Sequence, residues 1–349
     1  MKRFFLGMPE ELVVVDENGS SYDVQNHLSG IQPTFLTYDP FSPNRIYCGT
    51  NKQGLWVSDN GGDSWRKLDQ DFSDYAITSI LVSSTKKFRG YGVVYIGTEL
   101  SEIFYSEDGG QTWSRFDVIH SLPSYASWSF PANPATHNVR YITEDYKNGQ
   151  LYVSIEAGAV IRSKNNGENW MDTKLGHPLD AHTLLTHSKV ENRVYAAGSD
   201  GVDFPGRSLL MSLDGGESWQ TFSDGLNHPY LFSMIADKND PNTLLVSASL
   251  HARDAYDFTS AESYIYRKTG NEPWEIVNLG LPPAKGMMIS NLAMDPTTSG
   301  TFYALNNQGL YRSTDSGITW SEIPIAWHEK YRNQDAQRRH RSCFLVIDR

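Results

Sequence analysis

The chain has 349 residues, of which 39% are hydrophobic, and a formal net charge of −11. A chain of this length can bury a large core, whereas its acidic surface disfavours binding to the phosphate backbone of nucleic acids. The two cysteines, Cys48 and Cys343, are too few for a disulfide framework. The apolar run at the amino terminus stops at Pro9, too early for a secretory signal, and no run approaches the roughly 20 residues of a membrane span. We therefore expect a cytoplasmic protein that binds neither nucleic acid nor membrane.

From residue 33 onward the sequence repeats a group of four short strands. In the first group, β-branched and aromatic runs at 35–39, 45–49, 55–58 and 65–68 are separated by Gly, Pro, Asn and Asp, which is typical of strands joined by turns. Four strands per repeat make one blade of a β-propeller. Blades are predicted at residues 33–69, 76–117, 136–173, 181–222, 230–278 and 287–324.

Five of these six segments carry the pattern Ser-x-Asp/Asn-x-Gly-x-x-Trp between their third and fourth strands. Asp or Asn can hydrogen-bond the backbone that follows it, Gly accepts a positive φ, and Trp offers a large face to pack against a neighbouring sheet. A sixth, degenerate copy ends at Trp274, and successive tryptophans lie 46 to 57 residues apart, a period typical of propellers. The complete copies begin at Ser58, Ser106, Ser163, Ser212 and Ser313.

The two ends of the chain are predicted to share a seventh blade. Residues 3–27 hold three strand-like runs but lack an innermost strand, and the run at 343–347 has the pattern to supply it. Such sharing would leave no exposed sheet edge. The sequence thus predicts an all-β fold, a single-domain seven-bladed β-propeller over residues 1–349, closed by residues 3–27 together with 342–348.

The repeats resemble the Asp boxes, also called BNR repeats, of the sialidase-like and sortilin-like propellers. Other stretches resemble a bacterial group of single-domain Asp-box proteins usually labelled glycosyl hydrolase or exo-α-sialidase-like, which implies a hydrolase. A true sialidase is not implied, because such enzymes have six blades and an Arg-Ile-Pro segment that this sequence lacks near its start. The Asp box itself belongs to the fold and marks no active site. The matching stretches are 128–131, 137–140, 155–158, 180–183 and 260–263.

Propeller topology places the start of each first strand and the turn between the second and third strands on one face. Loops on that face converge on the mouth of the channel, a usual place for a ligand. The long insertions at 118–136 and 250–263 are also predicted there. Candidate functional residues are therefore sought on this face.

The first candidate site is a metal centre. His137, His182 and His228 stand near equivalent positions of three consecutive blades, and Glu156 is predicted nearby. Imidazoles with a carboxylate can bind a divalent transition metal and leave a position open for water or substrate. The alternative is that these histidines cap loops by binding backbone carbonyls.

The second candidate is a pair of carboxylates, Glu99 and Glu156, at the same repeat position of neighbouring blades. Two carboxylates that flank a scissile bond are the minimum for glycoside hydrolysis, and their separation decides retention or inversion. The alternative is that each pairs with a local Arg or Lys. With His182 and Arg140, these two glutamates make up the predicted catalytic set.

The third candidate is an anion clamp of Arg140, Arg253 and Arg341, whose guanidinium groups could hold a carboxylate. Trp128 and Phe130, in the long loop, either stack on a sugar ring or pack within the loop. Further residues predicted to bind the ligand are Tyr230, Asp180 and Glu262.

These residues favour a hydrolase that acts on a small or carbohydrate ligand, with a metal as a candidate cofactor. No glycine-rich loop leads from a strand into a helix, so no nucleotide cofactor is expected. Two alternatives stay open: a metal-dependent lyase, and a propeller without catalysis that serves protein interaction or assembly.

Overall fold

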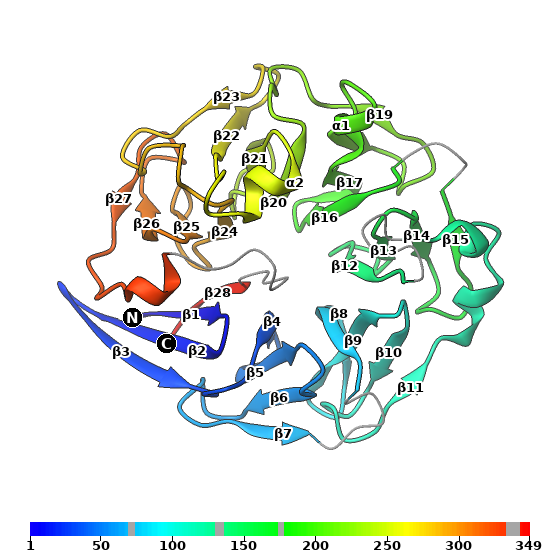
Figure 1. Cartoon of the computed structure of the whole chain (residues 1–349). Helices are drawn as coiled ribbons and strands as arrows, with labels where there is room; N and C mark the ends of the chain where they lie inside the picture. Colours follow the sequence, from blue (N-terminus) through cyan, green and yellow to red (C-terminus); the bar gives the residue numbers. More distant parts are fainter. Residues whose placement is uncertain (69–73, 130–135, 174–177, 333–342) are drawn as a thin grey trace. The chain divides into compact units, whose positions relative to one another are not determined.

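The computed structural model describes residues 1–68, 74–129, 136–173, 178–332 and 343–349. Seven four-stranded sheets account for its strands, and the chain is the predicted seven-bladed β-propeller (Figure 1). Its residues divide into two compact units. Unit 1 consists of Met1–Asn26, Ala197–Leu210 and Thr221–Arg349, and unit 2 of His27–Ala196 and Met211–Gln220.

Unit 2 holds blades 1, 2 and 3, each a sheet of four consecutive strands. Blade 1 consists of β4 (Pro33–Asp39), β5 (Ser42–Thr50), β6 (Leu55–Ser58) and β7 (Arg66–Leu68). Blade 2 consists of β8 (Ala76–Phe88), β9 (Tyr91–Glu99), β10 (Ile103–Ser106) and β11 (Ser114–Arg115), followed by the 3-10 turns η1 (Asp117–Ser121) and η2 (Tyr125–Ser127). Blade 3 consists of β12 (Val139–Glu144), β13 (Leu151–Ile155), β14 (Ala159–Ser163) and β15 (Met171–Asp172).

Blade 4 draws residues from both units, and blades 5 and 6 belong to unit 1. Blade 4 consists of β16 (Ala181–His187), β17 (Val190–Gly198), β18 (Leu209–Ser212) and β19 (Gln220–Thr221), with helix α1 (Asp200–Asp203) between β17 and β18. Blade 5 consists of β20 (Tyr230–Ala236), β21 (Thr243–Ser249), β22 (Tyr264–Thr269) and β23 (Glu275–Ile276), with helix α2 (Ala252–Tyr256) after β21. Blade 6 consists of β24 (Asn291–Met294), β25 (Phe302–Asn306), β26 (Gly309–Ser313) and β27 (Ser321–Glu322), followed by the 3-10 turn η3 (Glu329–Tyr331). No helix among the described residues is long and apolar enough to cross a membrane.

Blade 7 joins the two ends of the chain, as the sequence predicts, and all of its residues except His27 belong to unit 1. Its strands run in the order β28 (Cys343–Asp348), β1 (Lys2–Met8), β2 (Glu11–Asn18) and β3 (Ser21–His27). Phe5 of β1 lies opposite Val14 of β2 on one side and Leu345 of β28 on the other. The red carboxy-terminal strand therefore lies beside the blue amino-terminal one in Figure 1, and the last strand of the chain completes the first sheet.

The Asp boxes are closed by hydrogen bonds within a few residues of sequence. The Ser212 hydroxyl accepts from the backbone N–H of Gly216 (2.8 Å) and donates to Asp214 (2.7 Å), whose carboxylate accepts from the N–H of Ser218 (2.9 Å). Gly216 has a φ of +82°, which glycine adopts without strain. The same serine-to-glycine contact recurs in the boxes that begin at Ser58, Ser106, Ser163 and Ser313.

Neighbouring blades of unit 2 are joined by a buried carboxylate at the end of a first strand. The carboxylate of Asp39, at the end of β4, accepts from the N–H of Gly92 in blade 2 (3.1 Å). The carboxylate of Asp145, directly after β12, accepts from the N–H of Asn192 in blade 4 (2.6 Å). Both side chains are buried, so each contact satisfies a buried polar group of one blade with a donor from the next.

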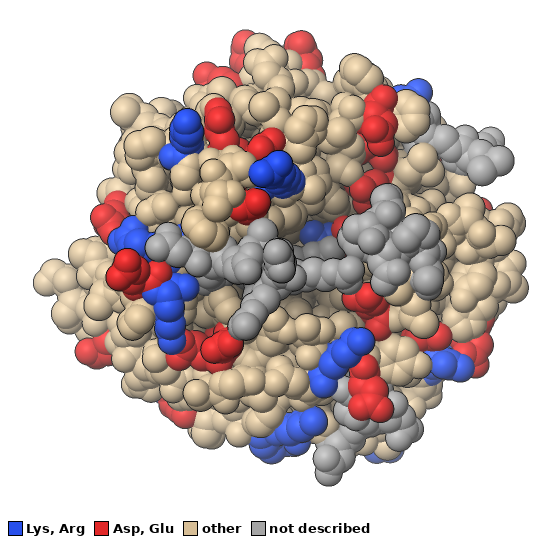
Figure 2. Space-filling model, viewed as in Figure 1, with Lys and Arg blue, Asp and Glu red and all other residues tan. Residues whose placement is uncertain are grey.

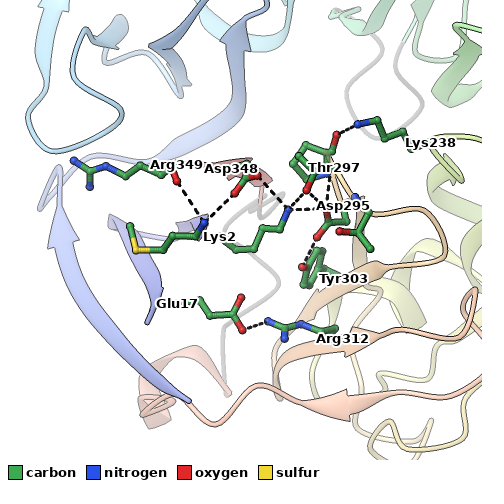
Figure 3. Close-up of polar contacts among 12 residues, drawn as sticks. Lys2, Glu17, Lys238, Asp295, Thr297, Tyr303, Arg312, Asp348 and Arg349 are labelled. Carbon is green, nitrogen blue, oxygen red and sulfur yellow. Dashed lines mark hydrogen bonds and ion pairs between the residues drawn. The ribbon is translucent and has the colours of Figure 1, made fainter. Parts of the chain in front are cut away.

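Unit 1 repeats this arrangement. Asp237, after β20, accepts from the hydroxyl of Ser299 (2.6 Å), which precedes β25 of blade 6. Asp295, after β24, accepts from the Lys2 ammonium group of blade 7 (2.7 Å) and from the Tyr303 hydroxyl (2.8 Å) (Figure 3). Burial opposes ionisation of Asp295, but hydrogen bonds from Lys2, the backbone after it and Tyr303 outweigh burial and hold its pKa well below the ordinary value.

Replacement of Ser212 by Ala tests the box as a stabilising turn. The variant leaves the buried N–H of Gly216 without its acceptor, so the free energy of unfolding should fall by about 1–3 kcal/mol. Urea denaturation measures this change. Asn242→Ala is the control, because Asn242 is an exposed loop residue outside the Asp boxes, and its effect should stay within about 0.5 kcal/mol. Equal losses in both variants would contradict the assignment.

The acidic boxes also predict how stability depends on pH. Burial raises the pKa of Asp315, but hydrogen bonds from Thr319 and Ser313 outweigh it and lower this pKa to about 2. The ionised carboxylate therefore stabilises the fold at pH values above its ordinary pKa of 3.8, and this contribution disappears as the pH falls towards 2. Asp315→Asn should flatten this part of the pH profile of the unfolding free energy.

Asn165 offers the reciprocal test, since it fills the same position in blade 3 with an amide that accepts from the N–H of Asn169. Asn165→Asp should steepen the acid loss of stability between pH 4 and 2, measured by urea denaturation. Unchanged slopes in both variants would show that the box carboxylates do not contribute to acid unfolding.

Candidate functional site

Three side chains with metal-binding or acid–base groups meet where blades 3 and 4 adjoin in unit 2. Glu156 follows β13, Asp180 precedes β16, and His182 is the second residue of β16. One nitrogen or oxygen atom from each lies within 4.8 Å of the others, and His182 Nε2 is 3.8 Å from Asp180 Oδ1. Glu156 and His182 are buried, whereas the Asp180 side chain is 21% exposed. We call these three residues the Glu156 cluster.

A tight turn after β13 positions both carboxylates of the cluster. Ala157 adopts a φ of +50°, a left-handed conformation that residues other than glycine rarely take. In this conformation its N–H donates to Asp180 Oδ1 (3.0 Å), and the N–H of the next residue, Gly158, donates to the carbonyl of Leu179 (2.8 Å). The turn that carries Glu156 therefore also holds the segment that carries Asp180.

Glu156 lies between an amide and a guanidinium group. Asn138 donates its side-chain N–H to Glu156 Oε2, and Nε of Arg140 lies 3.9 Å from the same oxygen. The backbone N–H of Glu156 also donates to the carbonyl of Asn138 (3.0 Å). Arg140 is buried, so its positive charge is compensated by Glu156 in a region with little water.

Arg140 occupies a β-bulge at the start of the innermost strand of blade 3, where the register of β12 against β13 shifts. Blades 1 and 2 have bulges at the same place, and there the bulged residue is Thr34 or Thr78. Each threonine donates to a backbone carbonyl of the next blade, Ile77 for Thr34 and Val139 for Thr78. Bulges can re-aim a side chain beside a functional site. The replacement of this threonine by a charged residue is a signal that the sequence analysis missed.

The structure does not bring the three predicted histidines into one group. Among the described residues, the one group of three candidate ligands contains His182 but neither His137 nor His228. The reason is their place relative to the strands. His137 and His228 stand two residues before β12 and β20, whereas His182 lies within β16, so an imidazole at the same approximate repeat position meets different neighbours.

His137 and His228 instead contact aromatic residues. The ring of His137 meets Trp128 edge-on, with centroids 5.8 Å apart. In unit 1, His228 stacks on Tyr264 at 4.1 Å, and its Nδ1 lies 2.6 Å from the Tyr266 hydroxyl. Burial lowers the pKa of both histidines. Both histidines therefore make structural contacts, as in the alternative in which they cap loops. The partners named here are aromatic side chains and not backbone carbonyls.

The carboxylate that lies beside Glu156 in the cluster comes from Asp180, which was predicted as a ligand-binding residue, and not from Glu99. Glu99 is half-buried at the end of β9, and its backbone pairs with Asn138. Glu99 and Glu156 stand at equivalent positions of the repeat, one blade apart. The end of the second strand of blade 3, with Glu156, instead adjoins the start of the first strand of blade 4, with Asp180. The Glu156–Asp180 pair follows from this adjacency.

Trp128 packs inside unit 2. It is 5% exposed, its indole N–H donates to the Ser124 hydroxyl (2.9 Å), and its ring meets Tyr125 edge-on at 5.0 Å. Little of its face is open to a sugar ring, so of the two interpretations the packing role fits the structure. Phe130 and Arg341 lie outside the described residues.

The remaining predicted ligand-binding residues belong to unit 1, whereas the cluster belongs to unit 2. The side chain of Arg253, on α2, is 75% exposed. Tyr230 is buried, and its hydroxyl donates to that of Tyr256 (3.2 Å). Glu262 accepts from the hydroxyl of Tyr264 (2.6 Å), which raises the pKa of that tyrosine to about 12.

Comparison with known families supports the repeat. A family model described as the BNR/Asp-box repeat matches residues 104–115, which contain the box of blade 2. The box hydrogen bonds recur in five blades of a seven-sheet fold. The chain is a seven-bladed β-propeller that carries Asp-box repeats.

A xyloglucanase from Hypocrea jecorina (strain QM6a) is 28% identical to this propeller over 129 residues. The match spans 36% of the propeller but only 15% of the xyloglucanase. The similarity therefore concerns a segment, and it leaves most of that enzyme without a counterpart here.

Solved structures share the fold of the propeller at low identity. YCF48 bound to D1 peptide superposes with a TM-score of 0.56 at 21% identity, over 83% of this chain and 81% of that one. An ancestral GH74 enzyme superposes with a TM-score of 0.62 at 17% identity, over 85% of this chain but 39% of that one. YCF48 from Cyanidioschyzon merolae gives 0.58 at 13% identity, over 85% and 86%. These identities show a common fold only.

Substitution of Trp128 tests its packing role. Trp128→Ala should lower the free energy of unfolding by about 3–5 kcal/mol, because it removes a buried ring and leaves a cavity. Trp128→Phe should cost less, since an aromatic ring still contacts Tyr125 and His137. Chemical denaturation measures both variants. If Trp128→Ala unfolds like the wild type, the residue does not pack in the core and the stacking interpretation is restored.

Proposed function

We propose that this propeller is a hydrolase that acts on a carbohydrate or another small polar ligand at the Glu156 cluster. The observation that carries the proposal is the convergence of two carboxylates and an imidazole within 4.8 Å of one another, beside a buried arginine. Buried charged groups are costly unless they are paired. A packed blade interface needs no such set, and the threonines of blades 1 and 2 serve at the bulge position that Arg140 fills here.

The cluster contains the groups that hydrolysis requires. A histidine or a carboxylate can take a proton from the attacking water and return it to the leaving group. Arg140 and the amide of Asn138 hold Glu156 in one orientation, and Ala157 holds Asp180. Because Asp180 is the most exposed of the three side chains, a substrate would reach it first.

The comparisons support a carbohydrate as the substrate class. The relative with a matching segment is named a xyloglucanase, and one solved structure of the same fold is a GH74 enzyme. Since this chain spans 15% and 39% of those proteins, their whole activities do not transfer to it. The proposal takes from them only that a propeller of this fold can form part of a carbohydrate-active enzyme.

A second candidate function is peptide binding without catalysis. A solved structure of the same fold is titled as YCF48 bound to D1 peptide, and the superposition covers most of both chains. On the face shown in Figure 2, acidic and basic side chains are interspersed among the described residues, a surface that offers an extended peptide partners of both signs. A single propeller is sufficient for this role.

The decisive experiment is a screen for release of reducing sugar from xyloglucan and other oligosaccharides, with nitrophenyl glycosides added for small substrates. The wild type should hydrolyse at least one of these. Glu156→Gln and Asp180→Asn should each lower kcat/KM at least about 100-fold, because each removes a proton-transfer group but keeps its shape.

Glu191→Gln is the matched control, since Glu191 is an exposed glutamate of the same unit outside the cluster, and it should keep a kcat/KM within a few fold of the wild type. The hydrolase proposal fails if the wild type releases no sugar, or if Glu156→Gln is as active as the wild type. Binding of the wild type to a peptide library in the absence of hydrolysis would then favour the second candidate.

A further inference from the structure

We infer that the Glu156 cluster is a binding site for one divalent transition-metal ion, held by Glu156, Asp180 and His182. This inference deepens the proposed function, since it assigns a cofactor to the same residues. It differs from the metal centre predicted from sequence, which used three histidines from three blades. Here two adjoining elements of unit 2, the turn after β13 and the start of β16, supply all three ligands.

The distances are close to those that a metal ion would impose. Nitrogen and carboxylate oxygen bind zinc-like ions at about 2.0–2.2 Å, so ligands of one ion lie about 3.0–3.5 Å apart. The three candidate atoms lie within 4.8 Å of one another, and His182 Nε2 and Asp180 Oδ1 are already 3.8 Å apart.

The groups around the cluster orient the ligands as second-shell contacts do in metal sites. The N–H of Ala157 fixes Asp180, and the strained φ of +50° at Ala157 is what aims this donor. Asn138 and Arg140 fix Glu156 through Oε2. Strained backbone in the left-handed region costs about 1–3 kcal/mol and is often found at functional sites.

Charge also favours a cation. Glu156 and Asp180 bring two negative charges within 4.8 Å, and Arg140 provides one compensating positive charge. Like charges at this separation repel strongly where water is scarce. A divalent ion between the carboxylates would replace this repulsion by attraction, and the burial of Glu156 and His182 would strengthen that attraction.

The donor set indicates the kind of metal. One imidazole with two carboxylates suits zinc, manganese or ferrous iron, whereas magnesium and calcium prefer oxygen ligands alone and copper(I) prefers sulfur. Three protein ligands would leave a position for water or substrate, as in catalytic rather than structural zinc sites. Asp180 is the most exposed of the three ligands, so solvent would have its readiest access to the ion beside it.

The test is calorimetric titration of chelator-treated full-length protein with zinc and, separately, with manganese, supported by elemental analysis after gel filtration. The wild type should bind one equivalent of at least one of these ions. His182→Ala and Asp180→Ala should each weaken binding at least about 100-fold, because each removes one of three ligands, a loss larger than the roughly 10–100-fold typical of outer-shell substitutions.

His137→Ala and His228→Ala are the matched controls and should bind like the wild type, because neither residue belongs to the cluster. Thermal unfolding confirms that each variant is folded, and Asp180→Ala keeps the test valid if His182→Ala does not fold. The inference is overturned if the folded wild type binds no equivalent of either ion, or if the control variants lose binding as fully as His182→Ala.

The outcome for the metal is separable from that for hydrolysis. One equivalent of bound metal without sugar release by the loaded protein would keep the site and reject the hydrolase. Full hydrolysis by chelator-treated protein that binds neither ion would keep the hydrolase and reject the metal.

Discussion

The arrangement of neighbouring blades depends on one recurrent contact, a buried carboxylate at the end of a first strand that accepts a hydrogen bond from the next blade. Backbone hydrogen bonds hold the strands within a sheet, whereas the sheet faces pack against one another through side chains. Asp39 and Asp145 supply the contact in unit 2. In unit 1 it is supplied by Asp237 and by Asp295, whose contact with Lys2 is drawn in Figure 3. Because a buried carboxylate without a donor is costly, each such contact fixes one blade against its neighbour.

The Glu156 cluster depends on this constraint. The contact from Asp145 to Asn192 ties blade 3 to blade 4, and the cluster joins the same two blades through Glu156, Asp180 and His182. Because this hydrogen bond and the packing of the two sheet faces hold blades 3 and 4 together, the blades can move little relative to each other at the cluster. The three side chains can therefore keep a separation of a few ångströms, which both proton transfer and metal binding require.

The proposed site is also where the repeat departs from its own pattern. Thr34 and Thr78 use the bulged position to bind the next blade, and Arg140 places a guanidinium group there instead. The buried Arg140 and Glu156 give this interface a pair of charges. Local departures from a stabilising pattern are expected at functional positions. The arginine at the bulge distinguishes blade 3 from blades 1 and 2, which have threonine there.

The sequence alone determined the seven-bladed fold, because the Asp box forms hydrogen bonds within a few residues and recurs with a regular period. The strand-like runs at the two ends of the chain predicted the closing blade. It also identified Glu156, Asp180, His182 and Arg140 as candidates. Only the tertiary structure showed that Glu156 adjoins Asp180 while His137 contacts aromatic residues, and that Trp128 is buried. These contacts depend on which strand ends meet between neighbouring blades and on a bulge in β12. The period of a sequence repeat predicts neither the meeting of strand ends nor the bulge.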